Sequence, residues 1–143
     1  MQRCNGATQV VLSARCSVKK SMTENKSYRE LEVWKEARKL VRLIYGVAEK
    51  LPDKEKFNLV SQMQRAAISI VSNVAEGVGR NTKKDTAQFM FIARGSIYEL
   101  ETQLFLSIDL PYIKEPEAQE AFLQIEKVRK LLSGFINYLQ KTN

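Results

Sequence analysis

The 143-residue sequence contains no histidine, and its two cysteines, Cys4 and Cys16, both lie near the N-terminus. Without histidine, the Ser-His-Asp and Cys-His nucleophilic systems are excluded, together with the usual zinc sites. Two thiols at this spacing match no metal motif, and they are too few for the disulfide framework of a secreted domain. We therefore expect no metal, no cofactor and a cytoplasmic location.

Long apolar runs are also missing, since none approaches the ~20 residues that a membrane-spanning helix needs. No segment alternates between polar and apolar residues as a half-buried β-strand does. A chain of this length forms one domain that buries roughly two-thirds of the surface of the unfolded chain. The sequence therefore predicts a single all-α domain with no membrane partner.

The net charge of +7 is unevenly distributed along the chain. Residues 1–26 carry five basic residues and one acidic residue, so this segment holds +4 and the rest of the chain holds +3. The segment has no sustained periodicity, which predicts a disordered basic extension, with Met22 as a candidate natural start. A targeting peptide and a basic arm that touches a polyanion are the two alternatives.

From Ser27 onward, four segments carry apolar residues at alternating spacings of three and four, which is typical of amphipathic helices. Ser27 and Glu30 form a capping box, and Thr82 is placed to cap the third helix. Pro52 and Pro111 mark helix ends. The core stripe expected for the first helix comprises Trp34, Ala37, Val41, Ile44, Ala48 and Leu51. Helices of about 20 to 25 residues joined by short turns predict an antiparallel up-down-up-down four-helix bundle over residues 27–143.

Two of these helices carry more apolar surface than one core needs. The third helix has a second apolar line spaced by sevens, and the first helix has a wide apolar arc. Contiguous exposed apolar patches usually mark interfaces, so we expect a homo-oligomer rather than a thick monomeric core with some exposed aromatics. The expected oligomer interface comprises Val33, Leu40, Val47, Phe91, Tyr98 and Phe105.

The stretch SIVSNVAEGVGR, residues 69–80, interrupts a valine-rich helix with polar residues that share one face. Small polar side chains permit close helix approach with hydrogen bonds across the gap, which predicts a polar seam. The seam comprises Arg65, Ser69, Ser72, Asn73, Glu76 and Arg80. A ligand or RNA contact is the alternative. No second acid or nucleophile is fixed beside Glu76, so we expect no catalytic residue and no enzyme.

The glycines at 77 and 79 do not form a phosphate-binding loop. They lack the third glycine and preceding strand of a dinucleotide fingerprint, and they lack the Lys-Ser/Thr of a Walker motif. We expect them instead to supply left-handed residues where the second helix ends.

Three segments, LEVWKEARKLV (31–41), SQMQRAAISIVSNVAEGVGR (61–80) and FIARGSIYELETQL (91–104), carry a family resemblance. In this order they resemble the four-helix-bundle proteins encoded in intervening sequences of bacterial 23S ribosomal RNA. The resemblance spans about residues 28–140, with Val71 where the family often has proline. It implies a helical bundle, commonly a ring-shaped homopentamer, with no established enzymatic activity. The sequence also looks related to the accessory variability determinant of diversity-generating retroelements, which implies a nucleic-acid enzyme as a possible partner class.

Basic residues gather on one face and at one end of the predicted bundle. Antiparallel topology places the turn between the second and third helices beside the start of the first helix, whereas the opposite end holds more acids than bases. The predicted nucleic-acid-binding residues are Lys35, Arg38, Lys39, Arg42, Arg80, Lys83 and Lys84. The alternative is a merely solvated face. Two functions remain open, an oligomeric adaptor associated with RNA or nucleoprotein, and a purely protein-binding or structural bundle.

Overall fold

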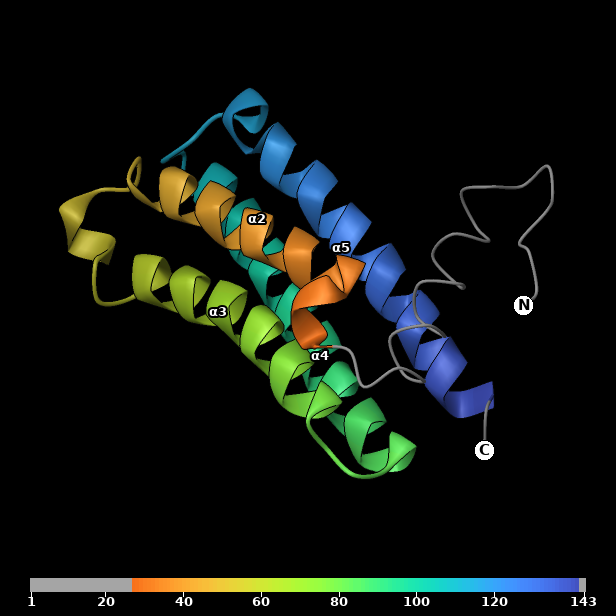
Figure 1. Cartoon of the computed structure of the whole chain (residues 1–143). Helices are drawn as coiled ribbons and strands as arrows, with labels where there is room; N and C mark the ends of the chain where they lie inside the picture. The colour runs from red at the N-terminus through yellow and green to blue at the C-terminus, as the bar shows by residue number, and fades with distance from the viewer. Residues whose placement is uncertain (1–26, 142–143) are drawn as a thin grey trace, which may run out of the picture.

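The computed structural model describes residues 27–141, which form four long helices and two single 3₁₀ turns (Figure 1). The elements are η1 Tyr28–Glu30, α2 Glu32–Ala48, η2 Asp53–Glu55, α3 Leu59–Val78, α4 Lys83–Asp109 and α5 Glu115–Lys141. No strand occurs within this range. The prediction of an all-α fold is therefore confirmed, while the predictions for residues 1–26 and both cysteines lie outside the described residues.

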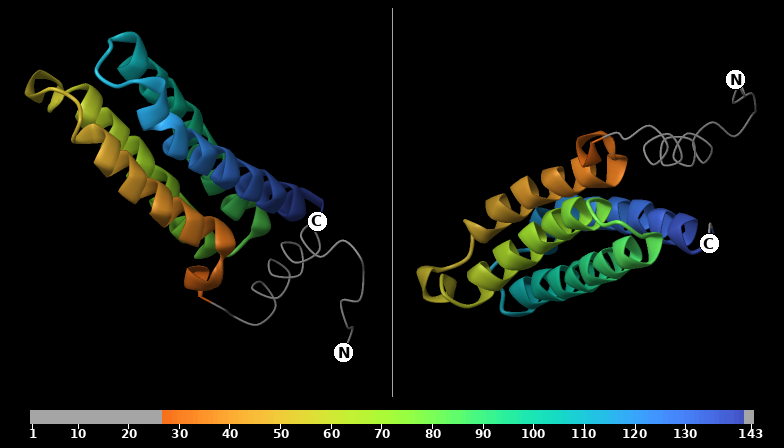
Figure 2. Two further views of the ribbon diagram at one scale, coloured as in Figure 1. Left: turned by 90° about the horizontal axis from the view of Figure 1, so that it is seen from above. Right: turned by 60° about the horizontal axis from the view of Figure 1, so that its bottom comes forward.

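Consecutive helices run antiparallel and occupy the corners of a four-sided bundle (Figures 1 and 2). α2 packs against α3 and α5, and α4 packs against the same two helices. The most extensive contact joins α3 to α4. This arrangement confirms the up-down-up-down bundle, and it brings the start of α2, the α3–α4 turn and the end of α5 to one end of the molecule (Figure 2).

The two predicted N-caps behave differently. Thr82 caps α4 as expected, because its Oγ1 accepts a hydrogen bond from the Asp85 amide at 3.1 Å. Ser27 accepts from the Arg29 amide at 3.3 Å, so it caps the short turn η1 rather than an α-helix. Leu31 is extended and buried between that turn and α2. The capping box therefore starts a single turn, and α2 begins at Glu32.

The core corrects the predicted oligomer interface on the first helix. Val33, Leu40 and Val47 are buried inside the single chain, with Leu40 completely inaccessible. α2 packs against two neighbours at once, so one bundle already uses its wide apolar arc. Trp34 and Val41, expected in the core stripe, are only partly buried and pack against the core from outside. The wide arc of this helix therefore gives no sign of a second partner.

The two glycines also differ from expectation. Gly79, the C-cap of α3, is right-handed with φ −76°, and Gly77 lies within the helix. A Cβ at Gly77 would lie 2.5 Å from Met90 Cε and 2.7 Å from Phe89 Cβ. Gly77 is therefore required by the close approach of α4, and the prediction of left-handed residues is wrong.

Among the described residues, no helix combines the length and the apolar character that crossing a membrane would take.

Candidate functional site

The predicted basic stripe on α2 is a solvent-exposed surface. Its four residues, Lys35, Arg38, Lys39 and Arg42, are all exposed, and we call them the α2 basic face. Arg38 lies over the Trp34 ring, 4.8 Å from its centroid, while Lys39 pairs with Glu36 at 2.8 Å. Within residues 27–141, Lys35, Arg38 and Arg42 form no ion pair with an acid. Most of the charge on this face is therefore not neutralised by the fold.

The other predicted cations surround the α3–α4 turn. The Arg80 guanidinium lies 4.5 Å from the Phe89 ring centroid and pairs with Glu76 at 3.1 Å. Lys83 lies over the Tyr138 ring of α5, and Lys84 is exposed. This turn lies at the end of the bundle where α2 begins, as the topology predicts (Figure 2). The α2 basic face starts from the same end.

A shallow groove of about 330 Å³ lies between α2 and α3. Its lining comprises Arg38, Val41, Arg42, Ile68, Val71 and Ser72, with no acidic side chain among them. The α2 basic face therefore borders a hollow whose floor is aliphatic. A second hollow, at the α3–α4 turn, is lined by Arg80, Asp85, Gln88 and Phe89.

The predicted polar seam on α3 divides into an inner and an outer part. Ser69 Oγ lies 2.9 Å from Ser96 Oγ of α4. The Asn73 side-chain Nδ2 donates to Ser69 Oγ at 3.0 Å and to the Ser69 carbonyl at 2.8 Å. Arg65, Ser72, Glu76 and Arg80 are exposed in the single chain. Within the seam, the hydrogen bond across the α3–α4 contact thus involves Ser69, while Glu76 pairs with Arg80, which lies just beyond the end of α3.

Sequence reasoning missed the α4 side of this contact. Ser107 donates to the Gln103 carbonyl at 2.9 Å, and its Oγ lies 3.7 Å from Met63 Sδ of α3. Gln103 is buried, and its side-chain oxygen has no hydrogen-bond partner. Their positions in the sequence could have predicted their burial, because Ser96, Gln103 and Ser107 are polar residues that follow the spacing of the core stripe.

α4 is apolar on several sides. Tyr98 and Phe105 of the predicted interface are each about half exposed, at 52% and 51%, while Phe91 is partly buried beneath Arg94. Phe105 packs on Phe122 of α5 with ring centroids 4.8 Å apart. The prediction missed four further exposed apolar residues in this part of the bundle. They are Ile92 and Leu106 of α4, Leu110 at the C-cap of α4, and Leu123 of α5. The adjacent apolar pairs at 91–92 and 105–106 were the available signal, because these positions lie off the core stripe of the third helix.

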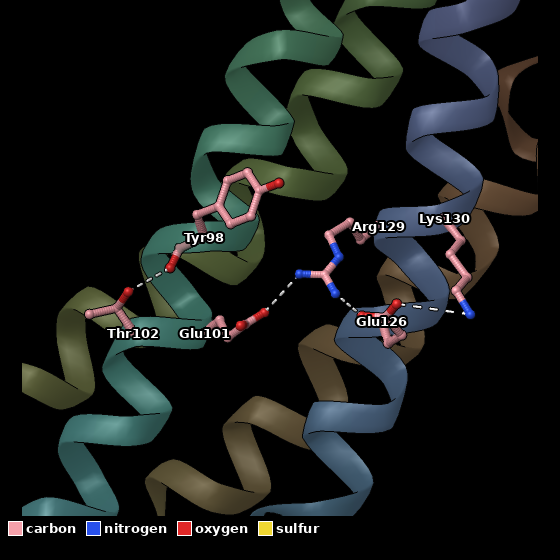
Figure 3. A network of polar contacts seen from close by, with 6 residues as sticks. All are labelled: Tyr98, Glu101, Thr102, Glu126, Arg129 and Lys130. Carbon is pink, nitrogen blue, oxygen red and sulfur yellow. Dashed lines mark hydrogen bonds and ion pairs between the residues drawn. The ribbon is translucent and has the colours of Figure 1, made fainter.

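Charged residues link α4 to α5 beside this apolar surface (Figure 3). Arg129 of α5 reaches Glu101 of α4 at 3.3 Å and also pairs with Glu126 of its own helix. Lys130 lies 3.9 Å from Glu126. Tyr98 projects from α4 close to the network, and its carbonyl accepts from Thr102 at 2.9 Å (Figure 3). The candidate interface on α4 thus combines exposed aromatics with fixed charges.

A buried acid, which the sequence reasoning also missed, joins α2 to α5. Glu36 has a side chain only 3% exposed, and it accepts from Lys39 at 2.8 Å and from Gln124 at 2.7 Å, with Lys127 at 3.3 Å. Burial raises the pKa of the Glu36 carboxyl, but these hydrogen bonds and cations outweigh it and lower the pKa from 4.5 to about 2. An acid within the apolar register of α2, next to Ala37, was the signal for it.

The described residues present two candidate contact surfaces. Over residues 27–141, no group of three or more cysteine and carboxylate side chains is placed to hold a metal ion. The surfaces that the structure offers are the α2 basic face with its groove and the apolar side of α4.

Comparison with known proteins gives a family and a fold. A family model described as 23S rRNA-intervening sequence protein matches residues 29–134. A crystal structure of a protein of unknown function, from the S23 ribosomal protein family of Bacteroides thetaiotaomicron, superposes with a TM-score of 0.67. It is 24% identical and covers 73% of this chain and 97% of its own. No curated protein matches the sequence.

Proposed function

Because the chain belongs to the 23S rRNA-intervening sequence protein family, we propose that it is a self-associating, non-enzymatic adaptor that contacts structured RNA or another nucleic acid. The observation that carries this proposal is the α2 basic face, where Lys35, Arg38 and Arg42 are exposed and form no ion pair with an acid inside residues 27–141. Cations left without acidic partners are available to phosphates. The cations of the α3–α4 turn, Arg80, Lys83 and Lys84, extend the surface.

Self-association rests on α4. Tyr98, Phe105 and Ile92 of this helix are each about half exposed. Exposed apolar patches mark protein–protein interaction sites, which supports self-association through this helix. The family resemblance suggests a pentameric ring, and the relation to the retroelement accessory protein suggests a nucleic-acid enzyme as a further partner. The cysteine usage suggests a cytoplasmic location. A ring would repeat the basic surface once per copy, and repeated contacts raise affinity through avidity.

Binding of a structured RNA to three forms of the full chain tests the proposal. The first is wild type. The second replaces Lys35, Arg38 and Arg42 with glutamine, and the third makes the same change at Lys54, Lys56 and Lys114, three exposed lysines of the opposite end. Both variants lose three positive charges, so any effect of net charge alone on RNA affinity is the same for both. We expect only the second to lose affinity, at least tenfold at low salt.

A purely protein-binding bundle is the second candidate, and the exposed apolar side of α4 favours it. Under that function, wild type would bind no RNA at ~50 mM salt, where phosphate contacts hold strongly. Equal affinity of all three forms would likewise contradict the proposed RNA contact. Recovery of the tagged protein from its own cells, with sequencing of bound RNA and identification of bound proteins, would then decide between the partners.

A further inference from the structure

The groove between α2 and α3 combines three features that a simple phosphate-binding surface does not need. Two arginines one helical turn apart border it, its floor is aliphatic, and a serine hydroxyl lies on the α3 side. We propose that this groove binds an unpaired segment of RNA, stacking one base on the Arg38 guanidinium while Arg42 contacts the phosphate backbone. This inference rests on the proposed RNA contact and specifies where and in which form the RNA binds.

Arg38 is held in position before any ligand arrives. Its guanidinium lies over Trp34, 4.8 Å from the ring centroid, and Trp34 in turn packs edge-on against Tyr28 at 5.3 Å. Arg38 is nevertheless exposed and lines the groove. Bases that are free of a duplex stack on arginine planes as well as on aromatic rings. A guanidinium supported by an indole loses little side-chain freedom on binding, which favours a stacked base.

The floor of the groove is suited to a base and not to phosphate. Ile68 is 44% exposed, and Val41 and Val71 are partly buried beside it. A duplex presents phosphates and sugars outward and hides the faces of its bases, so it gains nothing from an aliphatic floor. An unpaired base can cover these side chains and remove apolar area from water. Ser72 adds a hydroxyl that can donate to or accept from a base edge.

Three other occupants fit the groove less well. Residues 1–26 of the chain itself carry a net charge of +4 and would be repelled by Arg38 and Arg42. An acidic helix would match the arginines by charge, but it would not need a guanidinium held over an indole ring. A second copy of the chain would cover the groove only if the apolar floor contributed to the oligomer.

The test uses the full chain with a labelled 12-nucleotide single-stranded RNA and the corresponding 12-base-pair duplex. Arg38→Lys keeps the charge and removes the plane, and Arg65→Lys makes the same change at an exposed α3 position outside the groove. We expect Arg38→Lys to weaken single-strand binding roughly tenfold, with the salt dependence and duplex affinity unchanged. Arg65→Lys should alter neither. Ile68→Ala should weaken single-strand binding in the same salt-independent way.

Trp34 is the only tryptophan in the chain and gives a direct readout. A base that stacks on Arg38 should change the fluorescence of Trp34 when the single strand is added. This change should be lost in Arg38→Lys. Equal affinity of wild type for both RNAs together with a neutral Arg38→Lys would overturn the inference while leaving the proposed RNA contact intact. Failure of wild type to bind either RNA would overturn the proposed contact itself.

Two further measurements address the other occupants. Light scattering on each variant reports the oligomer mass, and a lower mass for Ile68→Ala would show that a second copy covers the groove, against the inference. A polyglutamate peptide of matching charge should displace the single strand poorly. If it competes as well as unlabelled RNA, charge alone accounts for binding and the base-stacking role of Arg38 is wrong.

Discussion

At the scale of single residues, Glu36 is the only charged residue buried in the part of the chain that the structure describes. It is buried, and it is charged because Lys39, Gln124 and Lys127 together stabilise the carboxylate more than burial destabilises it. Its pKa in the folded protein, about 2, lies below the ordinary 4.5. A carboxyl group whose pKa is lowered by folding stabilises the folded state at pH values above its ordinary pKa. This stabilisation is lost as the pH falls through the pKa of the folded state. The size of the shift corresponds to roughly 3 kcal/mol at neutral pH.

Glu36→Gln should therefore lower the free energy of unfolding by about 1–3 kcal/mol at pH 7, because the glutamine keeps an acceptor for Gln124 but loses both cations. Chemical denaturation at pH 7 and at steps down to about pH 2 measures this. The difference between wild type and variant should shrink as pH falls from about 5 to about 2. A constant difference across that range would show that Glu36 contributes through packing alone.

Glu76→Gln is the matched control. The Glu76 side chain is 56% exposed and pairs with Arg80 one turn away, so this change should cost less than ~1 kcal/mol. The sequence predicted a seam in which this glutamate would matter for folding or assembly. A loss similar to that of Glu36→Gln, or a change in oligomer size, would place Glu76 against a second copy.

Gly77 allows α3 and α4 to pack closely because it has no side chain. In Gly77→Ala the added methyl would meet Met90 and Phe89, and the Phe89 Cβ cannot move without its helix. We expect a loss of about 1–3 kcal/mol, although alanine alone favours a helix by up to ~1 kcal/mol. Gly46→Ala, at an exposed α2 position with no atom within 4 Å of the new methyl, should instead be neutral or stabilising. Thermal unfolding of both variants measures the contrast, and a neutral Gly77→Ala would mean that α4 shifts easily.

At the scale of elements, periodicity predicted the four helices and their order, because helix type depends on local spacing of apolar residues. Periodicity could not predict which apolar residues lie in the core of the single chain and which are left exposed for a second interface. Leu40 and Tyr98 both belong to seven-residue repeats, yet Leu40 is inaccessible and Tyr98 is half exposed. The difference arises from which neighbours each helix touches, and that information is not local. The same limit hid the role of Gly77, whose neighbours lie on another helix.

The α2 groove shows a further limit of sequence reasoning. The spacing of Arg38 and Arg42 placed both on one face, but the α3 residues opposite them, Ile68 and Ser72, were assigned to no common surface. Two helices lie side by side there, so no repeat along one helix predicts the hollow between them. The basic residues were predicted correctly as exposed, while their aliphatic surroundings were not.

Substitution of Tyr98 tests α4 as the associating element. Tyr98→Lys should dissociate the oligomer while helicity is retained, because the side chain lies outside the core of the single chain. Tyr45→Lys makes the same change at an exposed position of α2 and should leave the oligomer intact. Light scattering coupled to gel filtration, with circular dichroism, reads out both. A wild type that elutes as a 16.4 kDa monomer at micromolar concentration would contradict self-association itself.

Leu40→Glu is expected to act differently. Placing a carboxylate at an inaccessible position in the core should unfold the bundle rather than dissociate it, at a cost above ~4 kcal/mol. A folded monomer produced by Leu40→Glu would restore the interface that the sequence predicted on α2.

At the scale of the whole molecule, association and RNA binding are coupled through charge. Each copy presents the α2 basic face once, so an oligomer presents it several times to one RNA. The logarithm of the binding constant falls with the logarithm of the salt concentration by roughly 0.7 to 0.9 per phosphate neutralised. Replacing Lys35, Arg38 and Arg42 with glutamine removes up to three such contacts per copy, and the slope should fall by about two for each copy engaged.

The coupling predicts that a variant with every basic residue intact also loses RNA affinity. If Tyr98→Lys yields monomers, each monomer offers only one α2 basic face, although the new lysine adds one positive charge to α4. A salt titration of binding to a long structured RNA should then give a smaller slope and a lower affinity than wild type. Tyr45→Lys adds the same charge without dissociation, next to Arg42 on α2, so its slope should not fall below that of wild type. Equal slopes for monomer and oligomer would mean that one copy makes all the phosphate contacts, so association would serve a partner other than RNA.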